Sequence, residues 1–330
     1  MRVNVLIVDI HADVYAQHLR RDFPDLRVVT AREINELPAD LSRMDVLIAF
    51  GTSINDEVLR RLSGVKWIQS LATGVDHFLR CPYLSPAVLI TSGRGIHGPM
   101  MREMAAHLML CLSHDALRQV ADQKAHVWDR RAWTLLYEKS AVVVGIGVAG
   151  IAIGELLAAF GMNVIGVSRT PREIAGLTSV MHTDRLIEAA GRADYLINVL
   201  PASPENIGLF SRAVFAAMKP TAYFINIGRG ETIDEDALID CLRGNRIAGA
   251  ALDVFKARPL PPLSPLWDMP NVVITPHVGG YVVEYEDYVM PIVIENMRHF
   301  LAGRQSEMQN VVTRPPARPG LDDKGSSIAT

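Results

Sequence analysis

Two side chains that suit chemistry at a carbonyl group each follow a predicted buried strand. Arg229 stands between two glycines after the apolar run 222–226, and His277 follows the run 272–274. A planar guanidinium can bind both oxygens of a carboxylate and hold the neighbouring carbon in position. Histidine is the side chain whose pKa is most easily placed near neutral pH, as a proton donor requires. The pair predicts a site that binds a keto acid through Arg229 and protonates it from His277. The alternatives are an arginine that ties down a loop and a structural histidine.

A glycine pattern supplies a candidate site for the hydride donor that such chemistry needs. Gly145, Gly147 and Gly150 form G-x-G-x-x-G between a predicted strand and a predicted helix. The first glycine permits a tight turn, the second lets the backbone approach a pyrophosphate, and the third allows close packing of helix and strand. We expect the helix N-terminus, which includes Val148 and Ala149, to bind the phosphates. The alternative is a glycine-rich packing turn.

The next predicted strand indicates which dinucleotide binds. It ends in Ser168-Arg169-Thr170, where an NAD-binding unit is expected to carry an acidic residue for the ribose 2′-hydroxyl. An arginine there would instead pair with a 2′-phosphate. We therefore expect NADP(H), with NAD(H) as the second possibility. The alternative is that Arg169 is solvated and has no part in cofactor choice.

The elements that must position these residues are those of an α/β protein. Short apolar runs alternate with helical stretches, which predicts doubly wound parallel sheets with helices between the strands. The predicted strands are 3–8, 27–29, 46–49, 67–69 and 88–90, and then 142–144, 163–167, 195–199, 222–226, 248–252 and 272–274.

Two predicted helices carry apolar faces. The helix 98–114 has methionine, alanine and leucine on one face, and we expect that face to be buried on the second domain or on another subunit. The helix 286–301 contains Pro291, which should bend it or fix its first turn. The chain from residue 304 onward is poor in apolar residues, so 304–330 is expected to be a mobile tail.

Composition narrows the class of protein. The 330 residues carry a net charge of −3, with 49% hydrophobic and 21% charged residues, which argues against a disordered chain and against a nucleic-acid-binding protein. Three scattered cysteines, Cys81, Cys111 and Cys241, predict a reducing cytoplasm, and no metal-type cluster is evident. Within 141–167 the only charged residue is Glu155, but the glycines there favour a buried strand–helix–strand unit over a membrane span.

Taken together, the motifs resemble the D-isomer-specific 2-hydroxyacid dehydrogenases. The resemblance covers about residues 67–303 and rests on a set of motifs in one order: Gly74-Val75-Asp76, the glycine turn, Asn226–Gly230, Ala251–Phe255 and Thr275-Pro276-His277. The segment Gly95–Pro99 and Ser168-Arg169-Thr170 are similar to the glyoxylate/hydroxypyruvate reductase branch. The resemblance implies a Rossmann cofactor domain, 98–285, inserted into a flavodoxin-like substrate domain, 1–97 with 286–303. It also implies a homodimer, to which the methionine-rich helix is expected to contribute.

The resemblance also implies roles for particular residues. Asp253 would bind the nicotinamide amide, with a capping carboxylate as the alternative. The backbone N–H groups of Ala72, Thr73 and Gly74, in the loop 72–75, would receive the substrate carboxylate, with a plain turn as the alternative. Domain closure over the site would hinge near residues 97 and 285. Further contacts with the cofactor are expected from Leu200, Pro201, Ile227, Gly228, His277 and Gly279.

One position departs from the family pattern. The family usually has a glutamate where this chain has Arg258, just before Pro259. A carboxylate beside His277 would raise its pKa, and a guanidinium there would lower it. Arg258 could point to solvent or to the far end of an acidic or bulky substrate, or another carboxylate could replace the glutamate, from Glu284 or from a partner subunit. Otherwise the chain is a cofactor-binding regulatory or interaction protein. We expect an NAD(P)H-dependent reductase that converts a small 2-keto acid to a D-2-hydroxy acid, without nucleic-acid or membrane partners.

Overall fold

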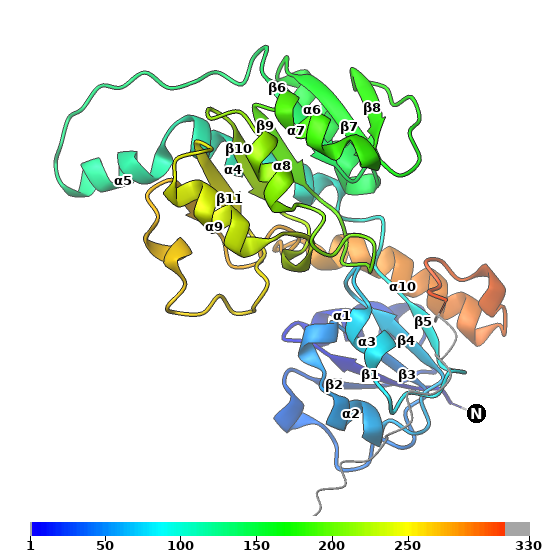
Figure 1. Cartoon of the computed structure of the whole chain (residues 1–330). Coiled ribbons are helices and arrows are strands. Elements are labelled where there is room, and N and C mark those ends of the chain that lie inside the picture. The colour runs from blue at the N-terminus through cyan, green and yellow to red at the C-terminus, as the bar shows by residue number, and fades with distance from the viewer. Residues whose placement is uncertain (1, 314–330) are drawn as a thin grey trace, which may run out of the picture. The chain divides into compact units, whose positions relative to one another are not determined.

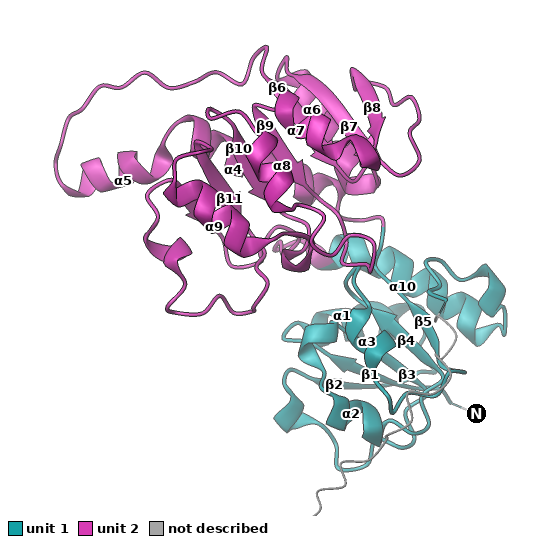
Figure 2. Ribbon diagram, viewed as in Figure 1, with its two compact units in different colours: residues 1–94, 286–330 teal, residues 95–285 magenta. Residues whose placement is uncertain are grey.

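The computed structural model describes residues 2–313 and divides the chain into two compact units (Figure 2). The described residues of unit 1 are 2–94 and 286–313, and unit 2 is Gly95–Tyr285. The chain therefore leaves unit 1 once and returns to it once, so unit 2 is one continuous insertion.

Unit 1 contains a five-stranded sheet in the order β2-β1-β3-β4-β5, with every pair parallel (Figure 1). This is the flavodoxin-like order, in which the first strand lies between the second and the third and the chain winds away from it on either side. The five strands predicted in the first hundred residues are confirmed. They are β1 Asn4–Val8, β2 Arg27–Ala31, β3 Val46–Ala49, β4 Trp67–Ser70 and β5 Leu89–Thr91.

A buried polar network attaches the last helix of unit 1 to its sheet. The Asn296 amide donates to Gln69 Oε1 at 3.0 Å, and the Thr91 hydroxyl donates to the same oxygen at 2.8 Å. Trp67 donates in turn to the Thr91 hydroxyl at 2.8 Å. Pro291 lies inside this helix rather than in its first turn. The helices are α1 Ala12–Asp22, α2 Asp56–Arg61, α3 Asp76–Arg80 and α10 Tyr285–Leu301.

The segment that follows α10 corrects the expectation of a mobile tail from residue 304. Val311 forms an antiparallel bridge with Thr91, and the Val312 N–H donates to the Ile90 carbonyl at 2.9 Å. Asn310 donates to the carbonyls of two residues in the chain that follows β5, and Met308 is buried. Polar composition hid this docking, because backbone and amide groups hold the segment together with only two apolar side chains, Met308 and Val312. The rest of the predicted tail, 314–330, lies outside the described residues.

Unit 2 contains a seven-stranded parallel sheet in the order β12-β11-β10-β9-β6-β7-β8. Counted from its first strand, this is the Rossmann order with one added strand. The prediction of doubly wound parallel sheets is confirmed for both units. The edge strand β8 was not predicted, because its half-exposed residues lack a continuous apolar run. The strands are β6 Ser140–Val144, β7 Asn163–Ser168, β8 Ser179–His182, β9 Tyr195–Asn198, β10 Tyr223–Asn226, β11 Gly249–Leu252 and β12 Val272–Ile274.

Alternate residues of these strands feed two hydrophobic layers. Val142, Leu196 and Phe224 pack with α7, α8 and α9 on one face, and Val143, Ile197 and Ile225 pack with α4 and α6 on the other. The methionine-rich face of α4 is therefore buried within its own unit and needs no second subunit to cover it. The helices are α4 Gly98–Ser113, α5 Ala116–Lys124, α6 Val148–Ala159, α7 Leu186–Arg192, α8 Arg212–Ala217 and α9 Glu235–Arg243.

The weakly charged stretch 141–167 folds as β6, α6 and β7, the buried strand–helix–strand unit expected from its glycines. Within residues 2–313, no helix is both long and apolar enough to cross a bilayer.

Candidate active site

The predicted site residues of unit 2 follow the carboxyl ends of neighbouring strands (Figure 1). Since all seven strands are parallel, these ends share one edge of the sheet, which is where doubly wound sheets bind ligands. Their order along the edge, from β12 to β7, is His277, Asp253, Arg229, Leu200, Gly145 and Ser168. Adjacent strands lie about 4.8 Å apart. One dinucleotide can therefore reach both the glycine turn after β6 and the residues Arg229, Asp253 and His277, which follow β10, β11 and β12.

The glycine turn meets the three requirements of a pyrophosphate site. Gly145 has a φ of +105°, and a side chain there would crowd Leu200 Cδ2 at 3.0 Å. A Cβ at Gly147 would meet no atom within 4 Å, so the turn is open on the side that a phosphate would approach. A Cβ at Gly150 would overlap the carbonyl oxygen of Gly145, so only glycine lets α6 begin this close to the turn. The residues present fit a bound dinucleotide.

The other residues that were expected to contact the cofactor differ in whether their side chains are accessible at this edge. Leu200 is half-buried and Pro201 is exposed, whereas the Ile227 side chain belongs to the hydrophobic core. Ile227 therefore has only its backbone at the edge. A Cβ at Gly228 would lie 2.7 Å from the Leu200 carbonyl oxygen, so a glycine is required where these two loops meet.

A buried amide network positions Arg229, and most of it was missed by sequence analysis. The Asn198 amide donates to Asn226 Oδ1 at 2.9 Å and to the Thr232 hydroxyl at 2.7 Å. That hydroxyl donates to the Arg229 carbonyl at 2.6 Å, and the Asn226 amide donates to the same carbonyl at 3.3 Å. All three partner side chains are fully buried. The signal in the sequence was that two adjacent buried strands each end in asparagine.

Asp253 fixes the loop that carries His277. Its buried carboxylate accepts from the Thr275 hydroxyl at 2.6 Å and from the N–H groups of Val278 and Gly279 at 2.9 and 3.0 Å. His277 itself has a φ of +58°, a conformation that non-glycine residues adopt mainly where the surroundings enforce it. Asp253 therefore holds the loop of His277 through hydrogen bonds, and its expected contact with the nicotinamide amide stays a prediction.

Arg229 and His277 lie close enough for the charge of Arg229 to affect the pKa of His277. Burial lowers the pKa of His277, and the positive charges of Arg229 and Arg258 lower it further, whereas Asp253 and Glu231 raise it. Arg229 is half-buried, and its guanidinium donates to the Gly228 carbonyl at 2.7 Å. A cation and an ionisable imidazole therefore act on each other at this edge.

A second imidazole, His97, lies near the same arginine. Its Nε2 is 3.3 Å from the Tyr285 hydroxyl, and a Cβ at Gly280 would lie 2.9 Å from its ring carbon Cδ2. Burial, and then the positive charge of Arg229, lower the pKa of His97 to about 4. A neutral His97 therefore packs against the His277 loop at neutral pH. Sequence analysis noted His97 only as part of the Gly95–Pro99 motif and assigned it no role in the site.

The Arg258 side chain forms an ion pair with Glu231, so its positive charge is balanced and it does not point freely into solvent. Its Nη2 lies 3.1 and 3.4 Å from the two carboxylate oxygens of Glu231, and both side chains are somewhat more than a third exposed. Glu284, the carboxylate suggested from the sequence as a replacement, is exposed and is not among the main groups that shift the pKa of His277. The carboxylate that pairs with Arg258 is Glu231, which was not singled out from the sequence although it stands two residues after Arg229.

The end of β7 carries the residues expected to distinguish NADP(H) from NAD(H). The Thr170 N–H donates to the Ser168 hydroxyl at 3.2 Å, which shapes the turn. Arg169 is exposed and lies 3.8 Å from Glu205, a loose ion pair that a phosphate could displace. Arg172, not considered from sequence, donates to the Ile146 carbonyl at 3.4 Å inside the glycine turn. One guanidinium group therefore contacts the glycine turn, and another follows the neighbouring strand β7.

The loop 72–75 follows β4 at the carboxyl edge of the sheet in unit 1. The Ser70 hydroxyl lies 3.1 and 3.2 Å from the carbonyls of Ala72 and Gly74, and the Gly93 N–H donates to the Ala72 carbonyl at 2.9 Å. These bonds turn the carbonyls of the loop toward the body of unit 1. The loop is thus a constrained turn, as a backbone anion site requires.

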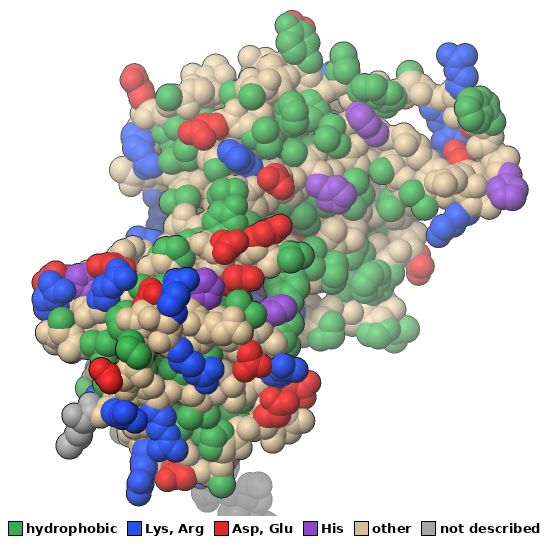
Figure 3. All heavy atoms as spheres, turned by 180° about the vertical axis from the view of Figure 1, so that it is seen from behind, with side chains coloured by type: hydrophobic (Ala, Val, Ile, Leu, Met, Phe, Trp, Pro, Cys, Tyr) green, Lys and Arg blue, Asp and Glu red, His purple; other side chains and the backbone are tan. Residues whose placement is uncertain are grey.

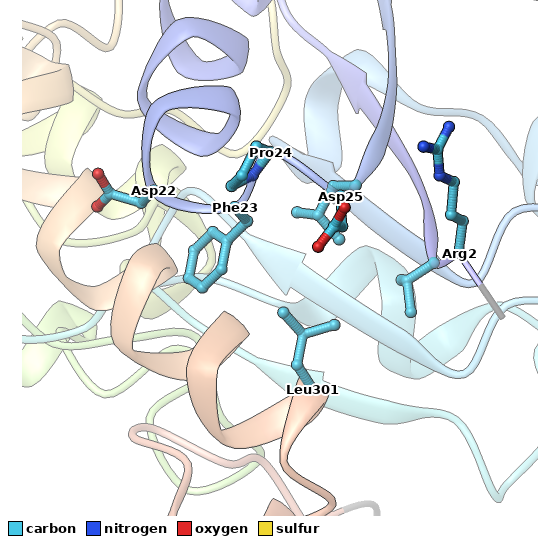
Figure 4. Close-up of a pocket in the computed structure, with 8 residues that line it drawn as sticks. Arg2, Asp22, Phe23, Pro24, Asp25 and Leu301 are labelled. Carbon is cyan, nitrogen blue, oxygen red and sulfur yellow. The ribbon is translucent and has the colours of Figure 1, made fainter.

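A surface hollow of about 510 Å³ in unit 1 lies elsewhere (Figure 4). It is lined by Arg2, Leu301 and the segment from Asp22 to Leu26. Arg2 precedes β1 and the segment Asp22–Leu26 precedes β2, so the hollow lies at the amino edge of the sheet, away from where such sheets bind their ligands. Within the described part of the chain, no group of three or more His, Cys, Asp or Glu side chains is arranged to hold a metal ion.

Comparison with family models agrees with the class that the fold and this edge define, a dinucleotide-binding α/β protein with two domains. Residues 106–279 match the NAD binding domain of the D-isomer specific 2-hydroxyacid dehydrogenases, and residues 5–78 match the catalytic domain of the same family. The chain belongs to the D-isomer specific 2-hydroxyacid dehydrogenase family, a family of NAD-dependent oxidoreductases. The resemblance inferred from the motifs and the expectation of a nicotinamide dinucleotide cofactor are confirmed.

Individual proteins of this family are similar to the chain in sequence or in structure. The chain is 33% identical to glyoxylate/hydroxypyruvate reductase A of Photorhabdus laumondii over 76% of its own length and 81% of the relative's. It is 30% identical to D-3-phosphoglycerate dehydrogenase of Methanocaldococcus jannaschii over 95% of its own length, but it spans only 60% of that protein. The structure of an NADPH-dependent glyoxylate/hydroxypyruvate reductase from Sinorhizobium meliloti, in complex with NADP and sulfate, matches with a TM-score of 0.82 and 28% identity. That match covers 95% of this chain and 99% of the other.

Replacing Gly150 by alanine tests the glycine turn. The added methyl group would overlap the Gly145 carbonyl, so the start of α6 must move and the phosphate-binding N–H groups must move with it. We expect Gly150→Ala to weaken binding of NADPH by at least about tenfold, the loss of roughly one charge-assisted hydrogen bond. Isothermal titration calorimetry measures it. Gly51→Ala, in unit 1, is the control, because a Cβ there meets its nearest atom at an ordinary contact distance of 3.4 Å; equal affinity in both variants would contradict the assignment.

Proposed function

We propose that this protein reduces a small 2-keto acid, similar to glyoxylate or hydroxypyruvate, to the D-2-hydroxy acid with NAD(P)H. The observation that carries the proposal is the edge at which Arg229, Asp253 and His277 follow three adjacent strands of a sheet that also holds the glycine turn. This edge offers a cation for a carboxylate, a rigidly held imidazole and a site for a dinucleotide, which are the three things that keto-acid reduction requires.

In the proposed mechanism the protein binds, orients and protonates the substrate. Arg229 binds the carboxylate through two parallel hydrogen bonds and holds the carbonyl carbon in position. The reduced nicotinamide supplies a hydride to that carbon. As the carbonyl oxygen becomes an alkoxide, His277 donates its proton to that oxygen and is left neutral. Asp253 contributes by holding the loop of His277, so that little rearrangement is needed during the reaction.

The substrate class is supported by the relatives of matching length. The Photorhabdus laumondii glyoxylate/hydroxypyruvate reductase A is covered over most of its length, and the Sinorhizobium meliloti reductase almost completely. The phosphoglycerate dehydrogenases are substantially longer than this chain, so the match to them supports the fold more than the substrate. In this proposal unit 2 binds the cofactor, and unit 1, with its loop 72–75, serves the substrate.

We propose NADP(H) as the preferred cofactor, with NAD(H) as an alternative. The support is the absence of an acidic residue at the end of β7, where Ser168 and Arg169 stand, together with Arg172 beside the glycine turn. The Sinorhizobium meliloti relative is described as NADPH-dependent and was crystallised with NADP. A 2′-phosphate would gain charge-assisted hydrogen bonds from Arg169, which the 2′-hydroxyl of NAD does not offer.

We also propose a homodimer, formed through the arm that connects α4 to β6 (Figure 1). Helix α5 buries none of its residues, and the extended segment after it carries exposed aromatic side chains, with Trp128 92% exposed. Apolar side chains are also spread over the back of unit 2 (Figure 3). Apolar patches of this kind mark protein–protein interfaces. The free state of all three cysteines supports a reducing, cytoplasmic location.

The oxidation of NADPH at 340 nm in the presence of glyoxylate or hydroxypyruvate tests the activity. We expect His277→Ala to lower kcat by roughly 10² to 10⁴-fold, the usual contribution of a general acid. His97→Ala serves as the matched control, because it also removes an imidazole near Arg229 but leaves the proposed proton donor. Tight NADPH binding without turnover of any keto acid, mono- or dicarboxylic, would instead favour a cofactor-binding regulatory protein.

Cofactor preference is tested by Arg169→Ala. The loss of hydrogen bonds to a charged phosphate is expected to raise KM for NADPH by about 10 to 100-fold, since such bonds are each worth about 1.5–3 kcal/mol. KM for NADH should change little, because NADH lacks the phosphate. Initial rates with both cofactors measure this ratio, and Arg185→Ala, an exposed arginine elsewhere in unit 2, is the control. A parallel rise for both cofactors would contradict a role in discrimination.

Oligomeric state is tested by Trp128→Ser combined with Leu135→Ser on the arm. Light scattering after gel filtration should give twice 36.3 kDa for the unchanged protein and 36.3 kDa for the double variant. Leu263→Ser, which removes a 95% exposed leucine outside the arm, should leave the mass unchanged. A monomeric parent protein, or a variant that stays dimeric, would refute the arm as the interface.

A further inference from the structure

The ion pair of Glu231 and Arg258 joins two loops of the candidate active site. Glu231 lies in the turn that follows Arg229, and Arg258 lies in the segment that follows Asp253. The guanidinium spans both carboxylate oxygens, at 3.1 and 3.4 Å. The pair therefore connects the loop after β10 with the loop after β11, next to the residues on which the proposed chemistry depends.

Backbone packing brings these two loops together. A Cβ at Gly230 would overlap the Phe255 carbonyl, so the loop of Arg229 runs directly over the chain between Asp253 and Arg258. Glu235 adds a second connection, because its Oε2 accepts from the Lys256 N–H at 3.1 Å. The ion pair is thus built on two segments that are already held in contact.

The four charged side chains named above shift the pKa of His277, and they differ in how freely they can move. Asp253 is committed to three hydrogen bonds in its own loop, and the Arg229 backbone is anchored by buried side chains. Glu231 and Arg258 are the remaining pair, and each is more than a third exposed. Their opposite charges act on the imidazole in opposite directions.

We propose that Glu231 compensates for the basic residue at position 258 in this chain, and that Arg258 is a positioning residue that holds the Glu231 carboxylate at this edge by its bidentate contact. This inference rests on the proposed function, in which His277 is the proton donor. An unpaired guanidinium at position 258 would disfavour the imidazolium that donates the proton. The pairing with Glu231 offsets part of that penalty, so the enzyme keeps its proton donor although position 258 is basic.

The proposal predicts the direction in which the titration of His277 moves. The folded protein already holds its pKa below the usual value, so the protonated form is lost as pH rises through that lowered pKa. Glu231→Gln removes a group that raises the pKa, and should shift both the titration and the fall in kcat/KM for reduction to lower pH. Arg258→Gln removes a group that lowers it, and should shift both to higher pH. A shift of half a unit changes the protonated fraction about threefold on the alkaline side.

The experiment follows the imidazole signals of histidine-labelled protein by NMR without cofactor, in parallel with pH profiles of NADPH-dependent glyoxylate reduction. The signal of His277 is assigned from its loss in His277→Gln. The matched control is Glu235→Gln, which removes a neighbouring carboxylate that is not among the main groups acting on His277 and keeps an oxygen for the Lys256 N–H. A third variant, E231Q/R258Q, tests whether the pair acts as a unit. Glu231→Gln should then shift the titration less in the Arg258→Gln background than in the parent, because an unheld carboxylate moves away into solvent.

Two results would overturn the proposal. One is a Glu231→Gln protein whose His277 titrates as in the Glu235→Gln control. The other is an equal effect of Glu231→Gln in both backgrounds, which would mean that Arg258 does not hold the carboxylate. The NMR measurement needs no turnover, so it is independent of the proposed function. The expected shifts in a protein that reduces no keto acid would support the ion pair and refute the dehydrogenase activity.

Discussion

The active edge of unit 2 depends on one buried carboxylate. Asp253 follows β11 and accepts three hydrogen bonds from the chain that leaves β12, so it fixes the turn in which His277 adopts a left-handed backbone conformation. A carboxylate buried without such partners would be costly, and the same is true of N–H groups buried without an acceptor. Each side therefore requires the other, and the proposed proton donor is positioned by a contact that does not involve its own ring.

The other half of the chemistry is positioned by neutral groups. Asn198, Asn226 and Thr232 form a chain of hydrogen bonds that ends on the Arg229 carbonyl. Amides can satisfy several donors and acceptors without adding charge, so they hold a guanidinium loop without changing the electrostatics of the site. The site thus separates two tasks: buried, fully bonded groups set the geometry, and the half-exposed pair of Glu231 and Arg258 adjusts the charge.

Prediction from sequence worked best where local rules decide the structure. The strand–turn–helix around Gly145, Gly147 and Gly150 and the long parallel strands were predictable, because glycine spacing and apolar runs are local signals. The edge strand β8 and the docking of residues 304–313 could not be predicted in this way. Mostly half-exposed or polar residues form them, and backbone hydrogen bonds hold them in place. The methionine-rich face of α4 was expected to be buried on the second domain or on another subunit, and of the two the structure shows the first, because the face packs on the sheet of unit 2.

The sequence by itself determined the order of the motifs, and with it the family, the doubly wound sheets and the identity of Arg229 and His277 as the residues to examine. It also showed that position 258 is basic where the family has an acid. Only the tertiary structure decided what that change means. Glu231 and Arg258 are 27 residues apart in the chain, and their contact exists because two parallel strands end at the same edge and one glycine allows their loops to touch. Charge balance at a site is a property of side chains that meet in space, and residue types along a chain do not specify which of them will meet.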